Sequence, residues 1–154
     1  MKSILFVCSA NQCRSPMAEV MFKKLVRDKG EEEHWRVESA GVWAFQGAPA
    51  TENAMQVMVE RELDLSQHLS QPVNPTMLSR FDVIVVMTLE HKRALLQQYP
   101  AITNRVFLLR ELGGEKGDFA DPVGGTLDTY RDTADELEIL LRRGYSSIKS
   151  AAAL

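Results

Sequence analysis

The stretch SILFVCSANQCRSP, residues 3–16, changes from an apolar run to a polar loop and then to a serine–proline pair. Its first part, residues 3–7, is typical of a buried strand, and residues 16–28 carry apolar side chains at helical spacing. The segment between them, residues 8–14, therefore joins the end of a strand to the start of a helix.

The rest of the chain alternates strand-like and helix-like segments, with no internal repeat or long linker. Further strands are predicted at 35–39, 83–86 and 105–108, and further helices at about 50–62, 89–98 and 127–143. Strands separated by helices predict an α/β fold with one open, mostly parallel, four-stranded twisted sheet and helices on both faces. In such folds sites form at the carboxyl ends of the strands, and Cys8 begins the loop at one of these ends.

The composition predicts one globular domain over residues 1–154. The chain is 45% hydrophobic and 25% charged, which is enough for a sizeable core. A net charge of −3 gives no overall attraction for nucleic acid or an anionic membrane, so neither is expected as a partner. The apolar run at residues 4–7 is too short for a signal peptide or a membrane span. We therefore expect a cytoplasmic monomer.

The loop after the first strand has the residues of an anion site. If residues 8–14 curl around an anion, their backbone N–H groups point inward and the following helix adds its positive end. We expect Cys8 to be a thiolate there, because helix N-termini and neighbouring cations stabilise charged sulfur. Arg14 carries a planar fork of donors that matches two oxygens of a phosphoryl group. The other residues expected to surround the phosphoryl group are Ser9, Ala10, Asn11, Gln12, Cys13 and Ser15.

Each of these features also has an ordinary structural explanation. Two cysteines are too few for a disulfide scaffold, and a small cysteine at a strand end is usually inert packing. Ser15 before Pro16 fits a helix cap followed by proline at the first helical position, although its hydroxyl could instead donate to the Cys8 sulfur. The combination is more specific than any one of these features. A catalytic phosphate loop is favoured by their order in the chain: a strand, a cysteine, five residues, an arginine, a serine–proline pair and a helix.

The sequence VCSANQCRSPMAE, residues 7–19, resembles the signature of the low-molecular-weight protein tyrosine phosphatases. The resemblance extends along nearly the whole chain. Its other landmarks are SAG at 39–41, LDLSQHLS at 63–70, FDVIVVM at 81–87 and DP at 121–122.

The resemblance implies a role for each matching residue. Cys8 would be the nucleophile, Arg14 would bind the phosphoryl group, and Ser15 would stabilise the thiolate. Asp121 would be the general acid, protonating the leaving group while Cys8 attacks phosphorus, and then activating water against the phosphocysteine. No metal or cofactor is expected. Without the loop motif, Asp-Pro in a glycine-rich segment would be interpreted as a turn.

The resemblance also implies roles behind the loop. Asn11, Ser39 and His68 match a hydrogen-bond network that holds the loop in shape, although a lone histidine such as His68 is more often simply structural. Cys13 matches a cysteine that forms a disulfide with Cys8 under oxidation and so protects it from over-oxidation. A small residue that fills space behind the loop is the alternative for Cys13.

The sequence leaves the substrate open between two phosphoamino acids. Tyrosine-specific relatives carry aromatic residues after the Asp-Pro pair, whereas this chain has residues 123–125, VGG. Trp43 and Phe45 are candidates for the opposite wall of a phenyl-binding slot, or else ordinary loop or core aromatics. Phosphotyrosine in a phosphoprotein is the first expectation, with free phosphate as product or competitive ligand.

Several segments resemble a branch of the same family, the bacterial protein arginine phosphatases. They are VVMTLEHK at 85–92, DPVGGTLDTY at 121–130 and DELEILLR at 135–142. In that branch a threonine before the second loop cysteine helps to select phosphoarginine, whereas this chain has Gln12. An amide can hydrogen-bond a guanidinium, although its side chain is longer. Phosphoarginine is therefore the alternative substrate.

Other classes fit the sequence less well. Arsenate reductases with a similar loop relay oxidation through further cysteines, and none follows Cys13. Phosphocarrier domains place a cysteine at the end of the first strand but lack the arginine–serine–proline pattern. The presence of both Cys8 and Asp121 argues against a non-catalytic phosphopeptide-binding module.

Overall fold

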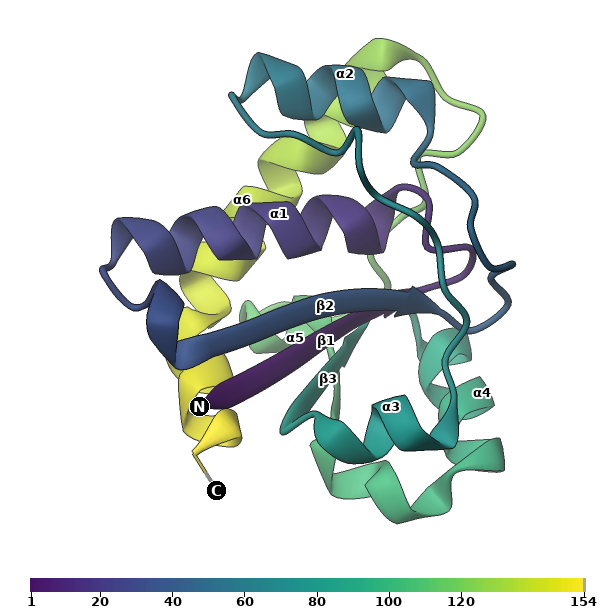
Figure 1. Ribbon diagram of the computed structural model, residues 1–154, viewed down its shortest axis with the longest axis vertical. Helices are drawn as coiled ribbons and strands as arrows, with labels where there is room; N and C mark the ends of the chain where they lie inside the picture. Colours follow the sequence, from purple (N-terminus) through teal and green to yellow (C-terminus); the bar gives the residue numbers. More distant parts are fainter. Residues whose placement is uncertain (154) are drawn as a thin grey trace.

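Four parallel strands form the centre of the molecule (Figure 1). The computed structural model describes residues 1–153. The strands are β1 (Lys2–Cys8), β2 (Trp35–Gly41), β3 (Val83–Val86) and β4 (Val106–Leu108). Their order in the sheet is β2-β1-β3-β4, and each neighbouring pair is parallel, so the predicted α/β sheet is confirmed.

Helices cover both faces of this sheet. The α-helices are α1 (Arg14–Asp28), α2 (Glu52–Glu60), α3 (Pro75–Arg80), α4 (Leu89–Gln98), α5 (Leu109–Leu112) and α6 (Leu127–Ala152). Two 3₁₀ helices are η1 (Glu32–His34) and η2 (Pro100–Arg105). Figure 1 shows α1, α2 and α6 on one side of the sheet and α3 and α4 on the other. Within residues 1–153, no helix is both long and apolar enough to cross a membrane.

The sheet divides the hydrophobic core into two halves, and its interior strand β1 contributes side chains to both. Ile4 and Phe6 point into the larger half, which includes residues of α1, α2 and α6. Leu5 and Val7 point into the smaller half under α3 and α4. All four side chains are fully buried. Burial on both faces explains why this strand appears in the sequence as a continuous apolar run rather than an alternating one.

Several boundaries differ from the sequence-based expectation, and three of them change which residues lie inside a helix or strand near the site or the core. Helix α1 begins at Arg14, with Cys13 as its N-cap residue and no side-chain cap, so Ser15 lies inside the first turn. Arg105 ends η2 instead of starting β4. Helix α6 continues past residue 143 to Ala152, and Gly144 within it is a contact point with α5. A Cβ at Gly144 would lie 3.1 Å from the Leu112 carbonyl oxygen, so the glycine lets α5 pack against α6.

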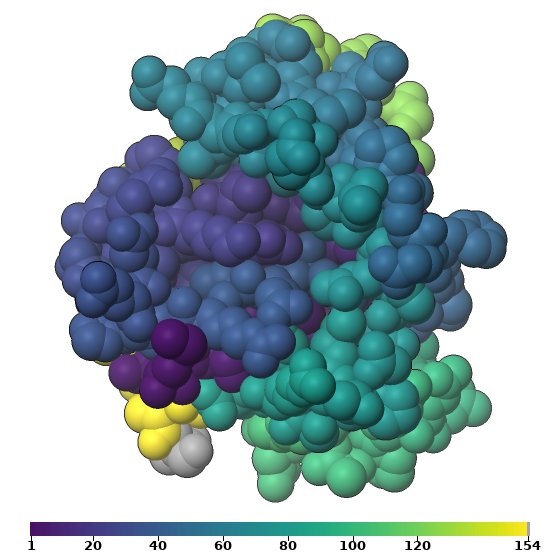
Figure 2. Space-filling view, in the orientation of Figure 1, coloured from purple at the N-terminus to yellow at the C-terminus, as the bar shows by residue number. Residues whose placement is uncertain are grey.

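The carboxyl ends of the strands bring distant segments together at one edge. Val42 N–H donates to the Cys8 carbonyl and Trp43 N–H to the Ser9 carbonyl, both at 2.9 Å, so the loop after β2 lies beside the loop after β1. A Cβ at Gly41 would lie 2.6 Å from the Ser9 oxygen, which explains the glycine there. The loop after β2 projects from the body of the molecule in Figures 1 and 2.

Candidate active site

The loop between β1 and α1 is held in shape by Asn11. This residue has φ of +58°, a left-handed conformation that asparagine adopts more readily than most residues. Its amide nitrogen donates to the hydroxyl oxygens of Ser15 at 2.8 Å and Ser39 at 3.0 Å, and its amide oxygen accepts the Gln71 N–H at 3.0 Å. His68 Nε2–H donates to the Asn11 carbonyl at 2.7 Å. The predicted network of Asn11, Ser39 and His68 is therefore assembled around the loop.

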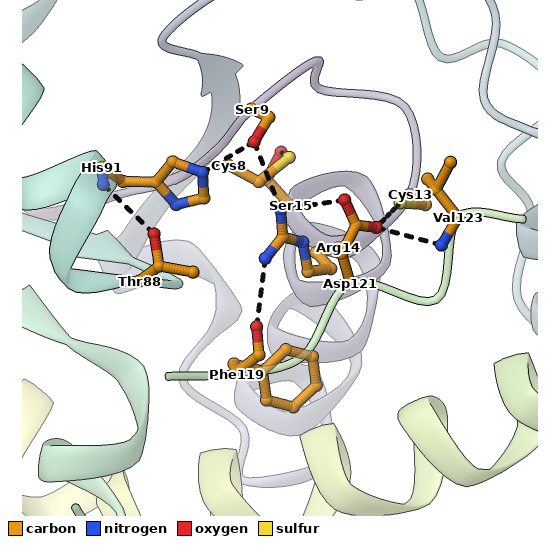
Figure 3. Close-up of polar contacts among 10 residues, drawn as sticks. All are labelled: Cys8, Ser9, Cys13, Arg14, Ser15, Thr88, His91, Phe119, Asp121 and Val123. Carbon is orange, nitrogen blue, oxygen red and sulfur yellow. Dashed lines mark hydrogen bonds and ion pairs between the residues drawn. The ribbon is translucent and has the colours of Figure 1, made fainter. Parts of the chain in front are cut away.

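Cys8 ends β1 with its sulfur directed at the start of α1. Cys8 is 2% exposed, and its Sγ lies 2.9 Å from the Ser15 hydroxyl oxygen (Figure 3). Ser15 has a single hydrogen, which has two acceptors within reach: the Cys8 sulfur and the Ala40 carbonyl at 3.3 Å. A sulfur anion attracts this hydrogen more strongly than a neutral carbonyl does. The Ser15 hydroxyl therefore lies at the Cys8 sulfur and does not cap α1.

Arg14 is buried and directs its guanidinium across the loop. Nη1 donates to the Phe119 carbonyl at 3.0 Å, and Nη2 lies 3.3 Å from both the Ser9 hydroxyl and Asp121 Oδ2 (Figure 3). Within residues 1–153, the buried Nε has no hydrogen-bond partner. A buried donor without a partner is costly in a folded protein. It suits a site that binds an anionic oxygen.

Asp121 reaches the loop from the segment between α5 and α6. Its side chain is 41% exposed. Oδ1 accepts hydrogen bonds from the Val123 N–H at 3.1 Å and from the Cys13 thiol at 3.6 Å, while Oδ2 pairs with Arg14. The Phe119 N–H donates to the Met87 carbonyl at 2.8 Å, which fixes this segment over the end of β3. The carboxyl group is thus placed beside the loop but remains open to solvent.

Cys13 is buried next to this carboxylate. Burial raises the pKa of its thiol to about 12, and the nearby Cys8 and Asp121 raise it in the same direction. Arg14 opposes this effect without cancelling it. Cys13 is therefore a neutral thiol at physiological pH.

The two aromatic side chains at the rim of the site differ in their surroundings. The Trp43 ring lies 5.9 Å from the His91 ring at 57°, and half of the tryptophan is exposed. Phe45 is 86% exposed. Its carbonyl accepts the hydroxyl hydrogen of the buried Ser70, which anchors the backbone of this loop. The Gln12 amide donates to the Pro49 carbonyl at 3.1 Å.

Three polar side chains near the loop were missed by the sequence analysis. The Ser39 hydroxyl donates to Glu19 Oε1 at 2.7 Å, Gln71 Nε2 donates to the Ser39 carbonyl at 2.9 Å, and His91 Nε2 lies 2.8 Å from the Ser9 hydroxyl. Glu19 lies one helical turn after Ser15, and His91 follows the carboxyl end of β3. These two positions were the features of the sequence from which Glu19 and His91 could have been predicted to lie near the loop. Among the described residues 1–153, no group of three or more His, Cys, Asp and Glu side chains is arranged to hold a metal ion.

The fold and the loop define an α/β protein whose loop between β1 and α1 presents a cysteine sulfur beside a serine hydroxyl. Comparison with known families gives the class: the profile of the low molecular weight phosphotyrosine protein phosphatases matches residues 3–153. The chain belongs to this family.

Individual relatives fall into two named activities. The chain is 39% identical over 147 residues to a protein-arginine-phosphatase of Bacillus subtilis, covering 95% of this chain and 96% of that one. It is 34% identical to the low molecular weight protein-tyrosine-phosphatase PtpB of Staphylococcus haemolyticus, covering 90% and 94%.

Solved structures of similar proteins share the fold. A YwlE mutant from Bacillus subtilis superposes with a TM-score of 0.91 at 37% identity, covering 97% of this chain and 99% of that one. A low molecular weight protein tyrosine phosphatase from T. tengcongensis superposes with a TM-score of 0.90 at 36% identity, covering 96% and 99%.

Proposed function

We propose that this protein is a cysteine-dependent protein phosphatase that forms a phosphocysteine intermediate. The observation that carries the proposal is the convergence of the Cys8 sulfur, the Ser15 hydroxyl and the Arg14 Nε on one loop at the N-terminus of α1, with no partner for that Nε among residues 1–153. A phosphoryl group bound there receives donors from the loop and from the guanidinium, and these donors need no rearrangement as charge develops.

The chemistry has two steps. In the first, Cys8 Sγ attacks phosphorus, the bond from phosphorus to the leaving group breaks, and protonated Asp121 gives its proton to that group. In the second, water attacks phosphorus, Asp121 takes the proton of that water, and the sulfur–phosphorus bond breaks to release inorganic phosphate. The exposed half of Asp121 gives the carboxyl group access to both the leaving group and water.

Phosphotyrosine is the first substrate we propose. The half-exposed Trp43 ring, supported from behind by His91, supplies an aromatic surface at the rim. An aromatic side chain of this kind favours offset or edge-to-face packing with a phenyl ring.

Phosphoarginine is the second candidate, because the opposite rim lacks aromatic side chains. Residues 123–125 are Val, Gly and Gly. Asp121 and the Gln12 amide oxygen are both acceptors that suit a guanidinium leaving group. The names of the Bacillus subtilis and Geobacillus stearothermophilus relatives support the same candidate.

We also infer that the protein is a single domain that acts as a monomer in the cytoplasm on phosphoprotein substrates. Two core halves that share one sheet support the single domain, and the two free cysteines suit a reducing compartment. Inorganic phosphate is the proposed product and a competitive ligand.

The deciding experiment measures kcat/KM on peptides of matched sequence that carry phosphotyrosine or phosphoarginine, with release of free phosphate as the readout. Cys8→Ser protein is the blank. A preference for phosphotyrosine assigns recognition of the substrate side chain to Trp43, and a preference for phosphoarginine assigns it to Asp121 and Gln12. Absence of phosphate release from both peptides would overturn the proposed function in favour of a carrier or a binding module.

A further inference from the structure

His91 lies beside the phosphate loop, although it comes from a different part of the chain. It occupies the first turn of α4, where its N–H donates to the hydroxyl of the N-cap residue Thr88 at 3.1 Å (Figure 3). The residue is only 1% exposed, and the Trp43 ring lies against it. Its ring therefore has a fixed orientation set by helix start, burial and aromatic contact.

One ring nitrogen of His91 contacts the loop directly. Nε2 lies 2.8 Å from the Ser9 hydroxyl oxygen, while the buried Nδ1 has no partner within residues 1–153. A buried N–H without an acceptor is rarer in proteins than an unsatisfied acceptor. The hydrogen is therefore assigned to Nε2, and His91 donates to Ser9.

Ser9 links this histidine to Arg14. The Ser9 hydroxyl oxygen also lies 3.3 Å from Arg14 Nη2, so it accepts from both neighbours and keeps its own hydrogen free for a phosphoryl oxygen. Arg14 Nη2 has Asp121 Oδ2 as its other partner. While Asp121 is protonated and ready to act as the acid, it carries no charge to pair with Arg14, and Ser9 and the Phe119 carbonyl are the remaining anchors of the guanidinium.

We propose that His91 is a positioning residue that fixes the Ser9 hydroxyl, and through it the Arg14 guanidinium, for binding of the phosphoryl group. The inference deepens the proposed phosphatase function and rests on it. His91 touches neither the substrate nor the reacting atoms. Its contribution is the geometry of the two groups that do.

The charge state of His91 suits this role. Burial lowers its pKa from 6.5 to about 4, and the Arg14 guanidinium lowers it in the same direction, against the smaller opposing effects of Asp121 and Asp118. The imidazole is therefore neutral from about pH 5 upward. A neutral ring holds Ser9 without adding a second positive charge beside Arg14.

The test measures inorganic phosphate binding by titration calorimetry, and kcat and KM separately, for substitutions at His91 and Ser9. His91→Ala is expected to raise the phosphate Kd about fivefold to tenfold, the usual effect of one hydrogen bond near a charged group. Ser9→Ala is expected to raise it at least as much, because it also removes the hydroxyl that donates to the phosphoryl oxygen. The double variant is expected to match Ser9→Ala, because His91 acts through Ser9.

Two further variants separate positioning from packing. His91→Gln places an amide nitrogen where Nε2 lies and is expected to restore binding to within about twofold, whereas His91→Asn is too short and is expected to behave as His91→Ala. The effects are expected to be the same at pH 5.5 and pH 7.5. His34→Ala, at an exposed histidine of η1, is the matched control and is expected to bind phosphate normally.

The outcomes distinguish this inference from the proposed function. Multiplicative effects of His91→Ala and Ser9→Ala, or equal losses in His91→Gln and His91→Asn, would overturn the positioning role. Should His91→Ala fail to fold, the Gln and Asn pair carries the test. Phosphate binding without hydrolysis of either phosphopeptide would overturn the phosphatase proposal alone, and an unsubstituted protein that binds no phosphate would overturn the positioning role.

Discussion

The two cysteines of the phosphate loop are five residues apart and almost equally buried, yet their surroundings are opposite. Cys8 is 2% exposed and Cys13 is 4% exposed. The Cys8 sulfur lies next to a hydroxyl that can donate a hydrogen to it, whereas the Cys13 sulfur faces the Asp121 carboxylate. Burial alone therefore does not decide the chemistry of a thiol. The neighbouring donors and charges do.

The largest predicted effect is at Cys8. Cys8→Ser is expected to lower kcat by about 10³-fold or more, because the hydroxyl is a far weaker nucleophile than a thiolate. Calorimetry should still detect phosphate binding, since Arg14 and the loop N–H groups are unchanged. Substantial residual turnover in a Cys8→Ser preparation free of wild-type protein would remove Cys8 from the mechanism.

The second largest loss of activity is expected for Asp121→Asn. An amide cannot supply the proton, so kcat/KM on phosphopeptides is expected to fall about 10²-fold to 10⁴-fold. The loss should be smaller with para-nitrophenyl phosphate, whose leaving group needs little protonation. Asp132→Asn, at an exposed carboxylate of α6, is the control. Equal losses with both leaving groups would argue against a general acid and for a role in positioning Arg14.

Ser15→Ala tests the hydrogen bond that distinguishes Cys8 from Cys13. Hydrogen bonds to charged groups contribute roughly 1.5–3 kcal/mol, so kcat is expected to fall about tenfold or more. The rate of Cys8 alkylation by iodoacetamide at pH 6.5 should fall in parallel. Ser79→Ala removes an exposed hydroxyl on α3 and should leave both rates unchanged. An unchanged alkylation rate in Ser15→Ala would show that the hydroxyl does not stabilise the sulfur.

Cys13→Ala is expected to have the smallest effect on turnover, within about fivefold, because it removes one weak hydrogen bond to Asp121. Its effect should appear after oxidation instead. Peroxide converts Cys8 to a sulfenic acid, which condenses with the Cys13 thiol to a disulfide and water, and a reductant restores both thiols. The variant should lose this recovery. Mass spectrometry of the oxidised parent checks for the disulfide, and full recovery of Cys13→Ala would contradict the protective role.

Several features of the site could be predicted because they depend on neighbours in the sequence. The strand, the loop and the start of α1 are consecutive, so the spacing from Cys8 to Arg14 already places both on one anion site. The role of Ser15 stayed open, because a cap and an inward hydroxyl have the same sequence. The length of α6 was underestimated, since the approach of α5 at Gly144 depends on residues distant in the sequence.

The sequence alone determined the alternation of strands and helices, the buried central strand and the order of chemical groups along the phosphate loop. These properties come from hydrophobic periodicity and from contacts over a few residues. Which distant groups meet that loop depends on how the chain packs in three dimensions: Asp121 lies beside Arg14, His68 at Asn11, and His91 at Ser9. Parallel strands bring their carboxyl ends to one edge, but packing of the helices and loops sets which side chains lie within hydrogen-bond distance there.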